Sequence, residues 1–401
     1  MSTQQTKYSK GLNSLPPYLF VRIDQLKQEE RAKGADLIDL SIGDPDIPTP
    51  DHIVEAMSKA IRDSTTHRYP SSNGRLDFRQ AAANWCKGRF GIDLNPENEI
   101  ISLIGSKEGI GHTPFAFIDP GDVVLVPSPG YPVYQAATIL AGGVPYPMPL
   151  LKENNFLPLL KDIPQDILSK AKLMFLNYPN NPTGAVSTLE FFRQVVDFAF
   201  KHHIIVCHDM AYSEMYYDNN TIPLPPFSKG EHAPHSFLEV LGAMDIGMEF
   251  FSLSKTYQMT GWRIGFAAGN RDLIAGLLKI KGNLDSGAFE AVQMAGVAAL
   301  SSSQECTRKM REVYQERRAV LVNGLTQAGW DVYKSQATFY VWITTPAGYT
   351  SEEMSTRLLR EFSIVATPGN GFGEYGEGYI RMALTVDTQR MQEAVDRILR
   401  W

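Results

Sequence analysis

The sequence of 401 residues is poor in several features that mark common classes of protein. Its three cysteines, Cys86, Cys207 and Cys306, form no CxxC pair and no Cys/His ligand spacing, which disfavours a disulfide scaffold and a zinc module. No uncharged apolar run reaches the roughly 18 residues of a membrane span. Residues 1–10 are polar and lack the layout of a signal peptide. We therefore expect a cytoplasmic protein with no membrane partner.

A strong excess of one charge is also missing. The 38 Lys+Arg and 44 Asp+Glu give a net charge of −6, and no basic run is long enough to neutralise a series of phosphates. We therefore expect small-molecule partners and no nucleic acid. What is present, 43% hydrophobic and 20% charged residues, is typical of a folded globular chain. The length suits about two to four domains.

Short apolar runs alternate with helical patterns in the first two thirds of the chain. The runs are Glu99–Ile104, Val123–Val126, Lys172–Leu176, Ile204–Cys207, Glu249–Leu253 and Ile264–Ala268. Because these runs are continuous rather than alternating, they predict strands that are buried on both faces. The segment Thr188–Lys201 has an N-cap threonine followed by apolar residues at helical spacing, as in a crossover helix. The pattern predicts an α/β domain with a largely parallel sheet.

The domain organisation follows from two further features of the pattern. The connection from Leu253 to Ile264 is too short for a parallel crossover, so these two strands should be antiparallel if they pair. Beyond Arg271, long amphipathic helices lead to short strands, which predicts a second, α+β domain. These helices are Glu290–Leu300 and Ser303–Ala328, and these strands are Asp331–Tyr333, Phe339–Ile343 and Tyr379–Ala383. We expect an N-terminal arm over residues 1–49 that packs on the small domain, a large domain over 50–285 and a small C-terminal domain over 286–401.

Two candidate motifs are turns that follow predicted strands, where ligands bind in open α/β sheets. Gly105-Ser106-Lys107-Glu108-Gly109 opens a helix whose free N–H groups and dipole can hold a phosphate, although a plain glycine turn explains it equally well. The turn Asn177-Tyr178-Pro179-Asn180-Asn181-Pro182-Thr183-Gly184 is stiff and presents an Asn side chain, but turn chemistry alone also accounts for it. The chain has neither a Walker A loop nor a GxGxxG fingerprint.

Asp209 directly follows the strand signal Ile204–Cys207 and His208. A carboxylate at the tip of a buried strand needs a hydrogen-bonded or cationic partner, because an unpaired buried charge is costly. His202, His203 and His208 suggest a metal site. However, alternation along a strand does not bring them to one point with Asp209, so we expect no metal.

The most informative motif is Ser252-Leu253-Ser254-Lys255, followed by Arg263 in Gly-Trp-Arg-Ile-Gly. A lysine that leaves an apolar strand has its pKa lowered by desolvation, which makes the neutral amine a nucleophile toward carbonyls. Arg263 can contact a phosphate or carboxylate through two hydrogen bonds. In isolation, a lysine whose amine simply reaches solvent is the simpler interpretation.

The four motifs together change this balance. A phosphate cradle, an Asn, an Asp with Tyr212 three residues later, and a Ser-x-Ser-Lys followed by Arg are the parts that hold pyridoxal phosphate. This cofactor needs a lysine to form a Schiff base, an acid to keep its ring nitrogen protonated and donors around its phenolic oxygen. We therefore predict pyridoxal 5'-phosphate as the cofactor.

Over nearly its whole length, the chain resembles the fold-type I, class I/II aminotransferases. The motifs Tyr-Pro-Asn-Asn-Pro-Thr-Gly, Asp-x-Ala-Tyr, Ser-x-Ser-Lys and Gly-Trp-Arg-Ile-Gly occur in the order typical of that family. Residues 41–46, 105–109, 129–134 and 285–287 are most similar to the LL-diaminopimelate aminotransferases. The resemblance implies a mostly parallel central sheet with one antiparallel strand, a smaller α+β domain, and a homodimer with shared active sites.

The resemblance also implies roles for the cofactor-binding residues. Lys255 would form the Schiff base and, once freed by substrate, move the proton between the substrate Cα and the cofactor. Asp209 would form a salt bridge with the ring nitrogen, and Asn181 and Tyr212 would donate hydrogen bonds to the phenolic oxygen. The residues implied around the phosphate are Ser106, Lys107, Ser252, Ser254 and Arg263.

Five residues are implied at the substrate or along the cofactor ring. Tyr131 would stack on the ring, and Tyr69 would reach the phosphate from the neighbouring subunit, although core packing could explain either tyrosine. Arg381 would bind the substrate α-carboxylate through two hydrogen bonds, which a lysine cannot do equally well. Tyr18 and Gly43 would complete the substrate pocket, which Tyr131 and Asn181 also line.

The implied reaction moves the amino group of LL-2,6-diaminopimelate to 2-oxoglutarate, giving tetrahydrodipicolinate and glutamate for lysine and cell-wall precursor synthesis. The plant-type members have an acidic residue that reads the far amino group, but Ser71-Ser72-Asn73-Gly74 has none. Either a group around Asn283–Asp285 reads that end or the substrate differs.

Other activities are open on the same scaffold. The alternatives are an aspartate, alanine or aromatic aminotransferase, or a C–S lyase, because the same electron-withdrawing cofactor also serves β-elimination. A regulator that has lost catalysis is disfavoured, because Lys255, Asp209 and Arg263 are all present and no DNA-binding segment is appended.

Overall fold

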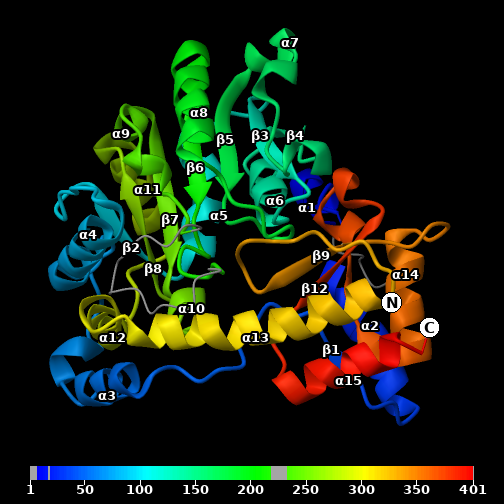
Figure 1. Cartoon of the computed structure of the whole chain (residues 1–401). Coiled ribbons are helices and arrows are strands. Elements are labelled where there is room, and N and C mark those ends of the chain that lie inside the picture. Colours follow the sequence, from blue (N-terminus) through cyan, green and yellow to red (C-terminus); the bar gives the residue numbers. More distant parts are fainter. Residues whose placement is uncertain (1–6, 17–18, 218–232, 401) are drawn as a thin grey trace, which may run out of the picture.

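The structure, a computed structural model, describes residues 7–16, 19–217 and 233–400. Its centre is a seven-stranded sheet in the order β2-β8-β7-β6-β5-β3-β4 (Figure 1). The strands are β2 Ile100–Leu103, β3 Val123–Ser128, β4 Val144–Pro149, β5 Ala171–Asn177, β6 Ile205–Asp209, β7 Gly247–Ser252 and β8 Gly265–Gly269. All except β4 are buried along most of their length, which confirms the strands predicted from continuous apolar runs.

One strand of this sheet runs against the others. Strands β3 to β7 pair in parallel with their neighbours, whereas β8 is antiparallel to both β7 and β2. The cause is the short connection after β7, which contains only the four-residue helix α10 (Leu253–Thr256) and a turn before β8 begins. The predicted mostly parallel sheet with one antiparallel strand is confirmed.

Strand β4 was not predicted from the sequence. Its sequence is Val-Pro-Tyr-Pro-Met-Pro, and prolines cannot donate to a strand ladder. The strand lies at the edge of the sheet and pairs with β3 alone among the described strands. No described strand on its other side needs the N–H donors that the prolines lack. An edge position is therefore the setting in which this proline-rich segment can form a strand.

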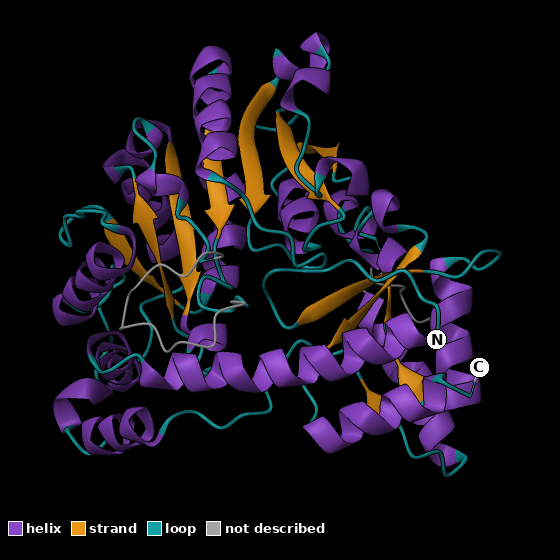
Figure 2. Ribbon diagram, viewed as in Figure 1, coloured by secondary structure: helices purple, strands orange, loops and turns teal. Residues whose placement is uncertain are grey.

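Helices cover both faces of the sheet (Figure 2). They are α3 Asp51–Ala60, α4 Leu76–Phe90, α5 Ser106–Phe117, α6 Val133–Leu140, α7 Gln165–Leu168, α8 Leu189–His202, α9 Ala243–Ile246, α11 Arg271–Leu284 and α12 Glu290–Ser301. Helices α5, α6 and α11 share one hydrophobic cluster with Ile101, whereas α4, α8 and α12 share another with Ile100. Successive strand residues thus serve opposite layers. Helix α8 starts at the predicted N-cap, Thr188, whose Oγ1 accepts from the N–H of Phe191 at 3.1 Å.

Most of the rest of the chain forms a second set of layers. Its elements are α2 Leu19–Ala32, β1 Ile38–Asp39, α13 Glu305–Gln327, β9 Tyr340–Thr344, α14 Ser351–Phe362, β10 Ile364–Val365, β11 Thr367–Pro368, β12 Tyr379–Ala383 and α15 Thr388–Ile398. The short helix α1 (Lys10–Asn13) instead contacts α6, which covers the large sheet. Strands β11, β12 and β9 form an antiparallel sheet, and β1 pairs in parallel with β10. The long helix α13 starts beside α12 and packs against α15 (Figure 1). The domain boundaries after residues 49 and 285 stay a prediction.

The predicted strand Asp331–Tyr333 is reduced to a single bridge beside β9, flanked by hydrogen bonds from the N–H of Tyr333 to the carbonyl of Trp342 and from the N–H of Thr344 to the carbonyl of Asp331. Only Val332 forms a β-bridge, to Ile343 of β9. The chain leaves the sheet after Tyr333, because the N–H of Ser335 donates a hydrogen bond to the carbonyl of Tyr333 at 2.8 Å and closes a tight turn. Within the three described ranges, no helix has the combination of length and apolar character that a bilayer crossing needs.

Candidate active site

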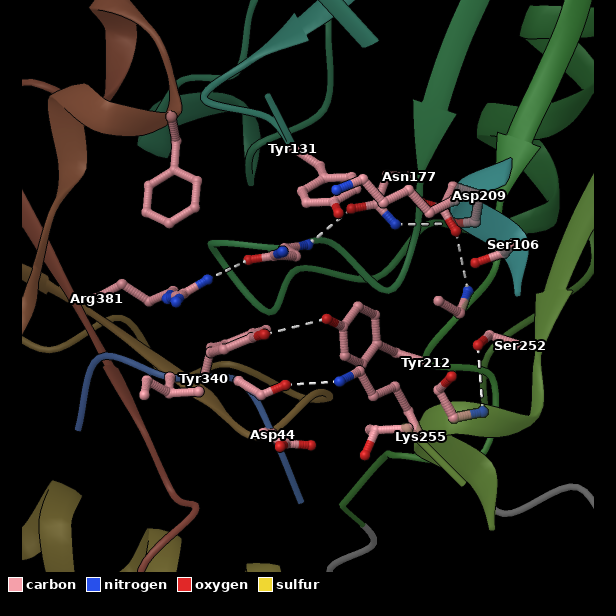
Figure 3. Close-up of a pocket in the computed structure, with 18 of the residues that line it drawn as sticks. Asp44, Ser106, Tyr131, Asn177, Asp209, Tyr212, Ser252, Lys255, Tyr340 and Arg381 are labelled. Atoms are coloured by element: carbon pink, nitrogen blue, oxygen red, sulfur yellow. Dashed lines mark hydrogen bonds between the residues drawn. The ribbon is translucent and has the colours of Figure 1, made fainter. Parts of the chain in front are cut away.

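A cavity of about 420 Å³ lies between the carboxyl ends of β5, β6 and β7 and the antiparallel strands β9 and β12 (Figure 3). Twelve of the predicted site residues line it: Gly43, Ser106, Lys107, Tyr131, Asn181, Asp209, Tyr212, Ser252, Ser254, Lys255, Arg263 and Arg381. Residues up to 338 positions apart in the chain therefore meet at one place. The lining residues that the sequence analysis did not select are Ile42, Asp44, Asn177, Ala211, Thr260, Tyr340 and Phe372.

One predicted residue that the structure describes, Tyr69, is not part of this lining. Tyr69 is 96% exposed in the single chain, so the core-packing interpretation of this tyrosine is wrong. Its predicted contact is with a neighbouring subunit and stays a prediction. Tyr18 lies outside the described residues.

Lys255 enters the cavity from α10, directly after β7. Its ammonium donates a hydrogen bond to the carbonyl oxygen of Gly43 at 2.6 Å. Burial lowers the pKa of Lys255 to about 8, although the carboxylate of Asp44 opposes this effect and the cations Arg263 and Arg381 reinforce it. A substantial fraction of the amine is therefore neutral near pH 8, and a neutral amine can attack a carbonyl carbon.

Asp209 ends β6 and is 5% exposed. Its Oδ2 accepts from the hydroxyl of Tyr134 at 2.7 Å, and its Oδ1 accepts from the N–H of Ala211 at 3.3 Å. Burial raises the pKa of Asp209 to about 6, while the Tyr134 hydrogen bond works in the opposite direction. Neither partner is a cation, so the carboxylate is suited to a positively charged partner in the cavity.

Tyr134 is the partner that the sequence analysis missed. It lies in α6, three residues after Tyr131, and is fully buried with its ring stacked on Phe175 at a centroid distance of 5.0 Å. The N–H of Tyr134 donates to the carbonyl of Tyr131 at 3.2 Å in the turn that starts α6, and the two rings meet edge to face at 5.9 Å. The spacing from Tyr131 was therefore a signal that Tyr134 faces the same region.

The proline-containing turn after β5 is held by its own amides. The side-chain oxygen of Asn177 accepts from the N–H of Asn181 at 2.8 Å, and its Nδ2 donates to the carbonyl of Asp209 at 2.8 Å. The predicted Asn side chain of this turn, Asn181, accepts through Oδ1 from Arg381 at 2.8 Å. Asn177 thus ties the ends of β5 and β6 together and fixes where Asn181 lies.

One end of the cavity has the features of an anion site. Ser106 is the first residue of the twelve-residue helix α5, and Ser252 Oγ accepts from the N–H of Ser254 at 3.2 Å (Figure 3). Gly105 has φ +77°, and a Cβ there would lie 2.5 Å from a terminal nitrogen of Arg263. The glycine therefore allows the guanidinium to lie against the start of α5, where free N–H groups already attract negative charge.

The opposite end is built around Arg381 of β12. The side chain is 2% exposed and donates to Asn181 and, at 2.7 Å, to the carbonyl of Ser41. Its Nε has no hydrogen-bond partner among the described residues. The guanidinium carbon lies 4.1 Å from the ring centroid of Tyr340 and 4.7 Å from that of Phe372. A buried cation with an unused donor is suited to a carboxylate ligand.

None of the described residues that line this cavity belongs to a group with metal-ligand spacing. Among the described residues, the one group with suitable spacing is Glu108, His112 and Asp285. The ammonium of Lys281 lies 3.0 Å from both Glu108 and Asp285, so a cation already bridges the two carboxylates. His208 instead has its Nδ1 2.6 Å from Glu249 Oε1 and its Nε2 3.1 Å from the backbone N–H of Tyr178.

Comparison with known proteins gives the class of this chain. Residues 35–398 match the family described as Aminotransferase class I and II, and the chain belongs to this family. Among its relatives, the LL-diaminopimelate aminotransferase of Syntrophobacter fumaroxidans is 54% identical over 390 residues, 97% of each chain. That of Aquifex aeolicus is 53% identical and covers 98% of each chain. The solved structure of substrate-bound BacF from Bacillus subtilis has a TM-score of 0.92 at 35% identity and covers 99% of this chain and 98% of that chain.

Family membership confirms the predicted enzyme class and fold. The chain is an aminotransferase with the α/β architecture that the resemblance implied. Enzymes of this class act on small amino and oxo acids, and the family implies pyridoxal phosphate as cofactor.

Proposed function

We propose that this protein transfers the amino group of LL-2,6-diaminopimelate to 2-oxoglutarate, reversibly, with pyridoxal phosphate as cofactor. The reaction would yield tetrahydrodipicolinate and glutamate and serve lysine and cell-wall precursor synthesis in the cytoplasm. The proposal is supported by the two relatives named LL-diaminopimelate aminotransferase that match nearly the whole chain. The observation that carries the chemistry is one cavity that holds Lys255, with a lowered pKa, and the buried carboxylate of Asp209.

The donor set fits pyridoxal phosphate. Neither Tyr134 nor Ala211, the described hydrogen-bond partners of the Asp209 carboxylate, is a cation, and the cofactor's protonated ring nitrogen would supply one. When bound, the cofactor accepts an amino group and its cationic ring withdraws the electrons of the Cα–H bond. The carboxylate of Asp209 would hold the proton on that nitrogen. The residues proposed to bind the phosphate are Ser106, Lys107, Ser252, Ser254 and Arg263.

Lys255 is proposed to be the group that attacks the cofactor aldehyde and later moves the proton at the substrate Cα. A pKa of about 8 suits both tasks, because the amine can take a proton and return it near neutral pH. Asn181 and Tyr212 would donate hydrogen bonds to the cofactor's phenolic oxygen. Tyr131 would lie along the ring.

Arg381 is proposed to bind the α-carboxylate of the amino donor. Its unpartnered Nε and the remaining N–H of a terminal nitrogen could form a two-point contact with a carboxylate. Burial of the guanidinium removes competing water, which strengthens such a contact. Gly43 and Tyr18 would close the pocket from the N-terminal side.

A panel of amino donors tests the substrate. LL-diaminopimelate should react with 2-oxoglutarate faster than aspartate, alanine or phenylalanine do, and absence of turnover with LL-diaminopimelate would refute this substrate. A C–S lyase would instead release ammonia and pyruvate from cystathionine without needing an oxo acid. For the cofactor, the purified protein should have a visible absorption band that substrate changes. A colourless protein that cannot be reconstituted with pyridoxal phosphate would overturn the whole scheme.

We also propose a homodimer in which Tyr69 contacts the phosphate bound by the other subunit. Almost complete exposure of this ring in the single chain supports a role outside its own subunit. Mixing inactive Tyr69→Ala and Lys255→Ala chains should form hybrid dimers in which one site carries both native residues, so activity should return. A monomer by sedimentation, or mixtures that stay inactive although hybrids form, would contradict the proposal.

A further inference from the structure

We propose that Tyr340 is a positioning residue that fixes Tyr212 and Arg381 relative to each other through two separate parts of its side chain. The inference rests on the proposed function, in which Tyr212 faces the cofactor and Arg381 faces the substrate carboxylate. Tyr340 was not among the candidate residues from the sequence. It lines the cavity and is 3% exposed.

The backbone places Tyr340 beside Arg381. Tyr340 begins β9, and the antiparallel register with β12 pairs it with Ala383 and pairs Trp342 with Arg381. Tyr340 and Arg381 are therefore diagonal neighbours on one face of the sheet, a separation that long side chains can bridge. The guanidinium carbon of Arg381 lies 4.1 Å from the Tyr340 ring centroid, within the range of a cation–π contact.

The hydroxyl of Tyr340 has a different partner. It lies 3.2 Å from the hydroxyl of Tyr212, and the two rings meet edge to face at 5.8 Å (Figure 3). A tyrosine hydroxyl has one hydrogen to donate. If Tyr212 donates that hydrogen to the cofactor's phenolic oxygen, Tyr340 must be the donor between the two tyrosines. Such a chain of donors strengthens the last hydrogen bond.

The N-terminal segment holds the Tyr340 hydroxyl in place. A Cβ at Gly43 would lie 1.8 Å from this oxygen, so only glycine lets the two approach. The carbonyl of the same glycine accepts from Lys255. Tyr340 thus contacts the segment that meets the proposed nucleophile, and neither its ring nor its hydroxyl can move without displacing a neighbour.

Phe372 provides a matched control. Its ring centroid lies 4.7 Å from the same guanidinium carbon, and it has no hydroxyl to offer Tyr212. Loss of the Phe372 ring should therefore affect Arg381 alone. Loss of only the Tyr340 hydroxyl should affect Tyr212 alone, and loss of the whole Tyr340 ring should affect both.

The experiment compares Tyr340→Phe, Tyr340→Leu and Phe372→Leu in the cofactor-loaded protein. The dissociation constant of glutarate, a dicarboxylate without an amino group, is measured from the change in the visible spectrum. The maximal rate of the half-reaction with glutamate is measured at saturation. We expect Tyr340→Phe to bind glutarate within about twofold of wild type and to react roughly tenfold more slowly, since one hydrogen bond to Tyr212 is lost.

Tyr340→Leu should show the same loss of rate and, in addition, a roughly three- to thirtyfold weaker binding of glutarate. Phe372→Leu should weaken glutarate binding and slow the maximal rate less than Tyr340→Phe does, because it leaves the Tyr340–Tyr212 hydrogen bond in place. Equal binding and rate in Tyr340→Phe and wild type would overturn the proposal, even if Tyr340→Leu fails to fold. A wild-type enzyme that prefers a donor other than LL-diaminopimelate would overturn the proposed substrate but not this inference, because every amino acid donor carries an α-carboxylate.

Discussion

The two walls of the cavity are built in different ways. The strand-end wall, with Ser106, Asp209 and Lys255, consists of side chains that follow strands of the seven-stranded sheet. The facing wall, with Tyr340 and Arg381, consists of side chains that project from the three-stranded sheet. The strand-end wall carries groups whose pKa values are moved toward neutrality, whereas the facing wall carries a guanidinium that stays charged. The strand-end wall therefore has the chemistry that the proposed cofactor and proton transfer need, and the facing wall has the chemistry that the proposed carboxylate recognition needs.

The largest effect is expected at Lys255 of the strand-end wall. Lys255→Arg keeps a positive charge but removes an amine that can be neutral near pH 8. The half-reaction with glutamate should slow by at least about a thousandfold, as expected when nucleophile and base are both lost. Stopped-flow absorbance measures this rate. Lys279→Ala, on the exposed side of α11, is the control. More than a tenth of the wild-type rate in Lys255→Arg would contradict the assignment.

Asp209→Asn should lower the maximal rate roughly a hundredfold, because a preorganised charge is lost. The same change should stabilise the cofactor-free protein. The pKa of Asp209 is about 6 in the fold against an ordinary value of 3.8, so the folded chain holds this proton more tightly than the unfolded chain does. Stability contributed by the protonated form is thus lost as pH rises from about 4 to 6, up to about 3 kcal/mol in total.

Denaturant unfolding of the cofactor-free protein measures this difference. Asp209→Asn should raise the free energy of unfolding by on the order of 2 kcal/mol at pH 8 and leave it unchanged at pH 4. Asp44→Asn removes an exposed carboxylate from the same cavity and should give no such gain. A gain that is equal at both pH values would show that the charge of Asp209 is not the cause.

Arg381→Lys tests the facing wall. A lysine cannot form the two-point contact, so saturation of the half-reaction should require roughly thirtyfold more glutamate. Cofactor affinity and the visible spectrum should not change. Arg390→Lys in α15, whose guanidinium pairs with Asp36 and Glu393, is the control. An equal loss of cofactor and substrate affinity would break the distinction between the two walls.

The smallest effect concerns the glycine at the start of α5. Gly105 and Gly91 share a positive φ, 77° and 76°, but Gly105 has ψ 153°, a combination that other residues rarely adopt, whereas Gly91 has ψ 18°, the ordinary left-handed region. Only at Gly105 would a Cβ also meet a neighbour, the Arg263 guanidinium. Gly91→Ala should lose about 1 kcal/mol of stability, and Gly105→Ala should lose more, up to about 3 kcal/mol. Gly105→Ala should also bind pyridoxal phosphate roughly tenfold more weakly, because Arg263 is displaced. Thermal unfolding and a cofactor titration separate the two effects. Equal cofactor affinity in the two variants would contradict the role of Arg263.

The strand-end wall could largely be predicted from the sequence. Polar residues that follow an apolar run can be recognised in the sequence itself, and parallel strands bring their carboxyl ends to one edge of the sheet. Asp209, Lys255 and Arg263 were found in this way. Tyr134 was missed because its importance depends on a contact with a residue 75 positions away.

The facing wall could be predicted only through the family resemblance. Arg381 and Gly43 carry no local signal of their own, and Tyr340 and Phe372 look like ordinary core aromatics in the sequence. Their roles arise from strand register and from a close approach between distant segments. Proline-rich β4 was not predicted for a related reason. Its sequence is compatible with a strand only at the edge of a sheet, and that position is not visible in the sequence.

The pairing of β1 with β10 joins the beginning of the chain to its end. During synthesis the ribosome releases the segments in order, so the large sheet can form long before residues 364–365 exist to receive β1. A nascent or truncated chain that ends before β12 would therefore carry the strand-end wall without Arg381. Such a chain could bind the cofactor but would lack the arginine proposed to bind the substrate carboxylate. It would become able to turn over substrate only once the last few dozen residues had been synthesised.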